Sequence, residues 1–149
     1  MKKKTKYLNS AEISFPALSQ NESFARSVVS AFLMQANPTI EEISDMKCAV
    51  SEAVTNAIVH GYAGGAGIVK MKMKLGADRE ATIEITDKGR GIEDVALAMT
   101  PMFTTNSDGD RTGMGFTVMQ TFTDRIKVTS KVGKGTRVKL VKKLSGDDT

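Results

Sequence analysis

Apolar residues recur at helical spacing in two long stretches of the chain. This spacing predicts one helix over about 20–36 and a longer helix that starts at about residue 40 and ends near Gly61, since glycine is common after the last helical turn. Capping-box spacing precedes both helices, at Ser19 with Glu22 and at Thr39 with Glu42. Two further helices are predicted, a short one at 95–99 and one that Gly113-Met114-Gly115-Phe116 opens.

Shorter stretches alternate apolar and polar residues, which is typical of half-buried strands. The clearest runs from Ile68 to Leu75, where apolar and cationic residues alternate. The other predicted strands are 12–15, as an edge strand, 81–86, 126–130 and 136–141. Hairpin connections require antiparallel pairing, so the order of elements predicts an α+β fold. We expect a two-layer α/β sandwich, with a mixed, mostly antiparallel sheet and helices on one face.

The length of 149 residues suits a single domain, and we expect it to span 1–149. Its ordered core is predicted at about 12–142, after a loose polar start over residues 1–10 and before a frayed tail.

Composition excludes several classes of protein. The net charge of +4 is mild and the basic residues are scattered, which argues against direct binding to nucleic acid. The single cysteine, Cys48, excludes an internal disulfide framework, and its place in an apolar helix pattern predicts a small core residue. One histidine gives no zinc site, and no apolar run is long enough for a membrane span. We therefore expect a cytoplasmic chain with no membrane partner.

The second half of the long helix carries polar side chains within an apolar stretch. Glu52, Asn56 and His60 are four residues apart, so they are predicted to form one polar line. Buried polar side chains need partners. These partners are either other protein groups or a ligand: a metal ion, a phosphate, or a hydroxyl that loses its proton.

Three glycine-containing motifs follow along the chain. Asp87-x-Gly89-x-Gly91 ends a strand; its aspartate can accept a hydrogen bond from an exocyclic amine, although the motif also fits a plain turn. Gly113-Met114-Gly115 opens a helix after Arg111 and Thr112, which suits phosphates or an ordinary helix entry. Gly135-Thr136 precedes the last strand and is the weakest of the three.

Taken in order, these motifs resemble the ATP-binding fold shared by gyrase, a heat-shock chaperone family, histidine kinases and mismatch-repair ATPases. The resemblance covers about 12–142 and implies ATP and Mg²⁺ as cofactors. It implies that Asn56 is the magnesium ligand, that Glu52 is the general base, and that Asp87 anchors adenine. It further implies that Gly89 and Gly91 shape the pocket, that Thr136 supports the adenine, and that a mobile lid over 104–116 wraps the phosphates. The lid residues concerned are Thr104, Thr105, Arg111, Thr112, Gly113, Met114, Gly115 and Phe116.

Longer segments are similar to the sporulation anti-sigma-F factor family: residues 18–26, residues 51–62, and Phe103-Thr104-Thr105 with 111–116. This resemblance implies a homodimeric serine-protein kinase. Its partners would be a sporulation sigma factor, which it sequesters, and an anti-anti-sigma protein, which it phosphorylates on serine. Glu22 and Arg26 would contact these partners.

Other functions remain open at the level of sequence. One is a general-stress anti-sigma kinase of the same fold. Another is a nucleotide-gated binding module without significant kinase activity, although a general base such as Glu52 is not needed for binding alone. A histidine-kinase fragment is disfavoured, because the only histidine, His60, lies inside the nucleotide-binding helix.

Overall fold

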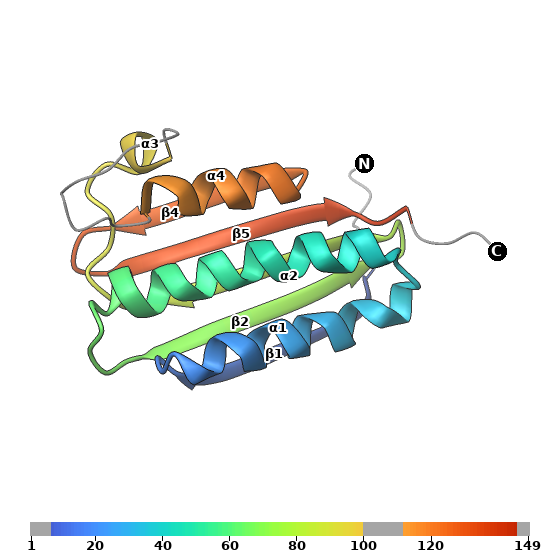
Figure 1. Ribbon diagram of the computed structural model, residues 1–149, viewed down its shortest axis with the longest axis horizontal. Coiled ribbons are helices and arrows are strands. Elements are labelled where there is room, and N and C mark those ends of the chain that lie inside the picture. Colours follow the sequence, from blue (N-terminus) through green and yellow to red (C-terminus); the bar gives the residue numbers. More distant parts are fainter. Residues whose placement is uncertain (1–6, 100–111, 146–149) are drawn as a thin grey trace, which may run out of the picture.

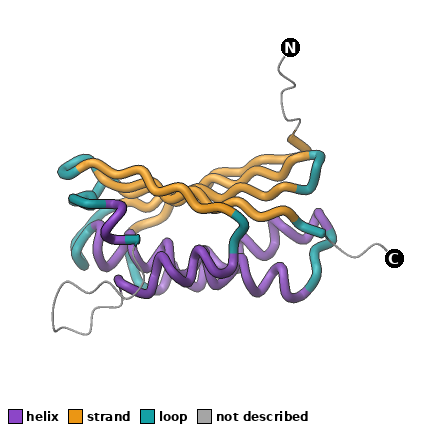
Figure 2. The backbone as a smooth tube through the Cα atoms, turned by 90° about the horizontal axis from the view of Figure 1, so that it is seen from above, coloured by secondary structure: helices purple, strands orange, loops and turns teal. Residues whose placement is uncertain are grey.

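The computed structural model describes residues 7–99 and 112–145. Within this part of the chain, five strands form one sheet in the order β1-β2-β3-β5-β4, and every pairing between neighbours is antiparallel. The described helices all lie on one side of the sheet (Figure 2). The predicted two-layer α+β sandwich is therefore confirmed, and its sheet is antiparallel throughout.

The strands follow the predicted alternation closely. They are β1 (Tyr7–Pro16), β2 (Ile68–Gly76), β3 (Glu80–Asp87), β4 (Arg125–Lys131) and β5 (Gly135–Lys143). β1 is an edge strand, as predicted, but it starts earlier than predicted, so the expectation of a loose start is wrong for residues 7–10. The reason is its pairing with β2, which extends from Pro16 opposite Ile68 to Tyr7 opposite Gly76.

The two long helices pack side by side over the sheet (Figure 1). They are α1 (Gln20–Leu33), which continues as the 3₁₀ turn η1 (Met34–Ala36), and α2 (Ile40–Thr55), which continues as the π-helical turn η2 (Asn56–Gly61). The short α3 (Val95–Ala98) and then α4 (Thr112–Phe122) complete the helical layer, with α4 against α2.

Two local predictions about these helices differ from the structure. Thr39 and Glu42 form the complete capping box of α2, but Ser19 makes no side-chain cap bond at the start of α1. Its supposed partner Glu22 bonds α2 instead. Cys48 is exposed and not a core residue, because it lies on the side of α2 away from the sheet.

The core fills the space between the helical layer and the sheet. Each inward position of β2 and β3 holds an apolar side chain until the last position of β3, which holds Asp87. The largest fully buried side chains are Leu33, Met46, Met71, Met73, Leu75, Ile83, Ile85, Met119, Leu140 and Leu144. A fully buried side chain of this size contributes about 1.5–3 kcal/mol to folding, so this layer dominates stability.

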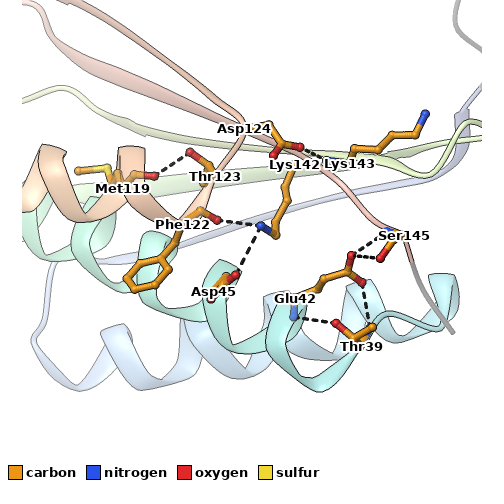
Figure 3. Close-up of polar contacts among 10 residues, drawn as sticks. All are labelled: Thr39, Glu42, Asp45, Met119, Phe122, Thr123, Asp124, Lys142, Lys143 and Ser145. Carbon is orange, nitrogen blue, oxygen red and sulfur yellow. Dashed lines mark hydrogen bonds and ion pairs between the residues drawn. The ribbon is translucent and has the colours of Figure 1, made fainter.

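Polar contacts fasten the end of β5 to the helices (Figure 3). Lys142 Nζ donates to the Phe122 carbonyl at the end of α4 (3.1 Å) and lies 3.5 Å from Asp45 Oδ2 on α2. Glu42 Oε2 accepts from both the backbone N–H (2.6 Å) and the hydroxyl (2.8 Å) of Ser145. These contacts hold the start of α2 against the end of β5. They therefore fix the orientation of the helix over the sheet.

No helix in residues 7–99 and 112–145 is long and apolar enough to cross a membrane.

Candidate functional site

The end of α2 meets the first turns of α4 at three residues named by the sequence. A Cβ atom built on Gly115 would lie 3.2 Å from Nδ2 and 3.3 Å from Oδ1 of Asn56, and 3.5 Å from Oε2 of Glu52. Glu52 and Asn56 therefore share one face of α2, as predicted, and this face meets α4 at Gly115. Figure 1 shows the two helices side by side. A larger residue at position 115 would crowd both side chains.

The helix changes form immediately after these residues. From Asn56 to Gly61 it is π-helical, with bonds to the fifth residue along in place of the fourth. A spacing of four no longer stacks His60 over Asn56 in such a turn, so the predicted polar line bends at Asn56. Both side chains nevertheless line the same cavity.

That cavity, of about 830 Å³, opens between η2, the inward side of β3 and β5, and α3. Its volume is in the range of small-molecule and cofactor sites. Its walls are mostly apolar, with Asp87 and Thr136 as buried polar groups. The apolar lining residues are Ala53, Ala57, Ile85, Ile92, Leu97, Ala98, Phe116, Val132 and Val138.

Asp87 lies at the bottom of β3 with only 5% of its surface exposed. Burial raises the pKa of its carboxyl, and hydrogen bonds from the backbone N–H groups of Gly89 and Thr136 oppose that rise. The N–H of Gly89 bonds Oδ1 at 2.9 Å. A Cβ on Gly61 would approach the carboxyl group to 2.8 Å, so the end of η2 rests directly on Asp87.

The two glycines of the Asp87 motif are required by close backbone packing. A Cβ at Gly89 would lie 1.9 Å from the Gly61 carbonyl oxygen, which no side chain could tolerate. Gly91 has φ of +78° and backs onto the Lys131 carbonyl, where a Cβ would approach to 2.3 Å. These contacts let the loop after β3 close one wall of the cavity against η2 and the β4–β5 turn.

Ser130 supports the same wall and was not predicted from the sequence. Its hydroxyl accepts from the Ile92 N–H (2.7 Å), donates to the Gly135 carbonyl (3.0 Å) and lies 2.8 Å from the Thr136 hydroxyl. Tyr62, also missed, accepts from the Lys88 N–H (2.8 Å) and bonds the Ile68 carbonyl. A serine in a strand and a tyrosine after a helix carry no sequence signal for these roles.

The predicted lid is only partly within the described residues. Thr104, Thr105 and Arg111 lie outside them. The backbone of Thr112, Gly113 and Met114 forms the first turn of α4, and Gly115 and Phe116 are buried in the next residues of that helix. Phe116 lines the cavity.

On α1, Glu22 and Arg26 are placed differently from each other. Both oxygens of the Glu22 carboxylate are occupied by α2, Oε1 by the Ser51 hydroxyl (2.7 Å) and Oε2 by the Thr55 hydroxyl (3.1 Å). Arg26 lies one turn further along α1, half-buried, and lines no part of the cavity. Ser51 and Thr55 immediately precede Glu52 and Asn56, so Glu22 braces the segment that carries those two residues.

Comparison with known proteins shows which family has this arrangement. Residues 15–142 match the histidine kinase-like ATPase domain family. Two relatives are the anti-sigma F factors of Thermoanaerobacter sp. (strain X514) and Caldanaerobacter subterraneus subsp. tengcongensis. The first is 54% identical over 95% of this chain and 98% of its own length, and the second 55% identical over 91% and 94%.

Solved structures show the same fold at much lower identity. The structure of the RsbU and RsbW domains of a Mycobacterium tuberculosis protein matches 91% of this chain and 32% of its own, with a TM-score of 0.64 and 19% identity. A blue-light activated histidine kinase of Erythrobacter litoralis matches 80% of this chain and 40% of its own, with a TM-score of 0.58 and 18% identity. With its domain matched over 15–142 and its sequence more than half identical to such relatives along nearly their whole length, the chain belongs to the anti-sigma F factor family of histidine kinase-like ATPase domains.

Proposed function

We propose that this protein is an ATP-dependent serine-protein kinase that also binds and inhibits a sporulation sigma factor. Its phosphorylation substrate is a serine of an anti-anti-sigma protein. The observation that carries the proposal is the meeting of Glu52, Asn56 and Gly115 beside the cavity that holds Asp87. Family membership supports both the kinase-like activity and the sigma-factor partner.

The residues of the cavity suit ATP. The Asp87 carboxylate accepts a hydrogen bond from the adenine amine, Gly89 and Gly91 shape the wall, and Thr136 supports Asp87 through its N–H. The apolar walls accommodate the flat ring. At the other end, the phosphates reach the start of α4, where free N–H groups favour anions. The lid residues Thr104, Thr105, Arg111, Thr112, Gly113 and Met114 are assigned to the phosphates with Gly115 and Phe116.

Asn56 also suits a magnesium ligand. Its Nδ2 is buried and has no hydrogen-bond partner in the described residues, so this donor is available to a ligand such as a phosphate oxygen. Carboxamide and carboxylate oxygens are hard ligands of the type that Mg²⁺ takes, together with nucleotide phosphates. When bound, Mg·ATP supplies the phosphoryl group that is transferred.

Glu52 is assigned to the proton transfer. It lies one helical turn before Asn56 on the same face, so it can approach the acceptor serine while Asn56 faces the metal. Taking the serine proton raises the nucleophilicity of Oγ as the bond to phosphorus forms. The proton passes to the glutamate carboxylate, while the bond between the γ-phosphorus of ATP and its bridging oxygen breaks and ADP leaves.

The direct test incubates the pure protein with labelled ATP and candidate anti-anti-sigma proteins, alongside pull-down of sporulation and general-stress sigma factors. We expect label on a serine of one candidate and capture of the sporulation sigma factor. Arg26→Ala should weaken capture while ATP binding is unchanged, because Arg26 lies outside the cavity. Nucleotide binding without transfer to any candidate would favour the binding-module alternative, and preference for general-stress sigma factors would favour the other kinase.

The Glu22 brace predicts a separable effect on catalysis. The double change Ser51→Ala and Thr55→Val removes both hydroxyl donors to Glu22 without altering the outer surface of α1. Each bond to a charged group contributes about 1.5–3 kcal/mol. We expect lower stability in urea and a lower kcat for serine phosphorylation, because Glu52 and Asn56 lose their support. Sigma-factor affinity should stay near that of the parent, and an unchanged kcat would contradict the brace.

We also propose that the protein is a homodimer. In the described residues β1 is an edge strand with no strand paired on its outer side. The exposed side chains of Leu18, just before α1, and Phe24, in α1, lie next to it. Sedimentation at concentrations of roughly tens of micromolar, where weak dimers associate, should give the dimer mass. A monomer over that range would rule the proposal out.

A further inference from the structure

The side of the sheet that faces away from the helices carries most of the cationic side chains of the strands. Its residues sit at alternate positions of each strand, opposite in direction to the core residues, and we call this surface the open face (Figure 2). Its acidic residues are Glu12, Glu80 and Glu84. Its basic residues are Lys70, Lys72, Lys74, Arg125, Lys127, Lys131, Arg137, Lys139 and Lys143.

The open face has an excess of positive charge, and one row of residues across the sheet shows where this excess lies. The register aligns Glu12 with Lys72, Lys72 with Glu84, Glu84 with Lys139, and Lys139 with Lys127. Charges alternate along the row until the last strand, where a lysine stands opposite a lysine. Like charges directly opposite each other destabilise a strand pair, so this position works against the fold. If the charges continued to alternate along the row, β4 would carry a carboxylate at the position of Lys127.

The ion pairs of the open face leave both lysines of this pair out. In the described residues, ion pairs on the open face join Lys70 with Glu12, Arg125 with Glu80 and Arg137 with Glu84, and none of them includes Lys127 or Lys139. The two lysines line a hollow of about 160 Å³ together with Glu84, Thr129 and Arg137. A hollow of this size holds one or two carboxylate groups.

We propose that the hollow at the β4–β5 edge of the open face binds an acidic segment of a partner protein, whose aspartate or glutamate side chains complete the charge row. The inference does not rest on the proposed kinase function, because the nucleotide cavity lies on the helical side of the sheet. β4 is an edge strand, so a carboxylate can reach Lys127 without displacing another element.

The charge pattern selects this occupant over two others. A second copy would place one cationic edge against another, which repels. A nucleic acid presents phosphates of one sign along its whole length, and Glu84 and Glu12 interrupt the cations along the row. A protein segment can place carboxylates at the hollow and cationic or neutral residues elsewhere.

The test uses ¹⁵N-labelled protein saturated with an ATP analogue, titrated with a short peptide that carries two glutamates between neutral residues, and followed by amide chemical shifts. We expect saturable shifts at Lys127, Thr129 and Lys139, weakening as salt is raised. Lys127→Glu with Lys139→Glu should lower the affinity by about tenfold or more, as removal of close charge pairs does. Lys47→Glu with Lys134→Glu, a matched change of charge away from the hollow, should leave it nearly unchanged.

Two controls keep the result decisive. If the charge-reversed protein does not fold by circular dichroism, Lys127→Gln with Lys139→Gln replaces it with the same expected direction. Shifts spread evenly over all lysines, or equal losses in the two charge-reversed variants, would overturn the proposal. Tighter binding of a single-stranded or duplex oligonucleotide at the same amides would also overturn it, in favour of nucleic acid.

Discussion

Replacing Glu52 with glutamine is expected to abolish most phosphoryl transfer while leaving ATP bound. The change keeps the size and polarity of the side chain and removes its basicity. A positioned general base contributes on the order of 10²–10⁴ in rate, so transfer to the anti-anti-sigma serine should fall by a factor in that range. ATP affinity and sigma-factor binding should change little, because Glu52 does not line the nucleotide cavity. Single-turnover phosphorylation and fluorescent-nucleotide titration measure the two quantities separately.

Glu41→Gln supplies the matched control for this change. Glu41 is an exposed glutamate in the first turn of the same helix, far from Gly115, and its replacement should alter neither quantity. Transfer by Glu52→Gln at nearly the parent rate would exclude Glu52 as the base. Loss of ATP binding would instead make Glu52 a residue that organises the site.

Replacing Asp87 with asparagine is expected to weaken ATP binding and, in the absence of nucleotide, to raise the melting temperature. A hydrogen bond to a charged group contributes about 1.5–3 kcal/mol, so affinity should fall by roughly tenfold to more than a hundredfold. The stabilisation follows from burial, since an ionised carboxylate in this apolar cavity is unfavourable and burial raises the pKa of Asp87. Isothermal titration and thermal unfolding measure both effects.

The pH dependence provides a check on the second effect. Because the folded pKa of Asp87 is raised, the folded parent loses stability relative to the variant as the carboxyl ionises. The difference in melting temperature should be absent below about pH 3.9, the ordinary aspartate value, and should grow as pH rises through the raised folded pKa. Asp78→Asn, an exposed aspartate, should show no such growth. An unchanged melting temperature for Asp87→Asn at all pH values would contradict the penalty of burial.

Periodicity predicted most of the fold, because the buried positions follow it. The alternation in β2 and β3 and the spacing in α2 each have one side in the core, so pattern and structure coincide. The extent of β1 and the exposure of Cys48 were missed, because the first depends on pairing with β2 and the second on which side of α2 meets the sheet.

The sequence predicted candidate-site residues whose role depends on their residue type. It did not predict those whose role depends on how the folded chain brings them together. Asn56 and Asp87 line one cavity, and Glu52 lies beside it on the same face of α2 as Asn56, because their motifs specify these polar residue types. The π-helical turn after Asn56 and the support from Ser130 have no such signal. The turn ends against Asp87 of a distant strand, and the Ser130 hydroxyl bonds the Ile92 N–H and lies against the Thr136 hydroxyl. The predicted partner contact of Glu22 stays a prediction, and its bonds to Ser51 and Thr55 were not predicted, because a sequence does not show which oxygens are already occupied.

Asp87 occupies the next inward position of β3 after Ala81, Ile83 and Ile85. Because inward and outward positions alternate, the number of residues in this strand cannot change freely. Insertion or deletion of a single codon just before Asp87 would turn Asp87 outward, and one earlier in β3 would also turn outward the apolar side chains that follow it. Selection on folding and selection on the proposed adenine contact would therefore act on the same alternation of residues along β3. The exposed loop at 63–66, which is outside this constraint, is where inherited length variation can accumulate without loss of either.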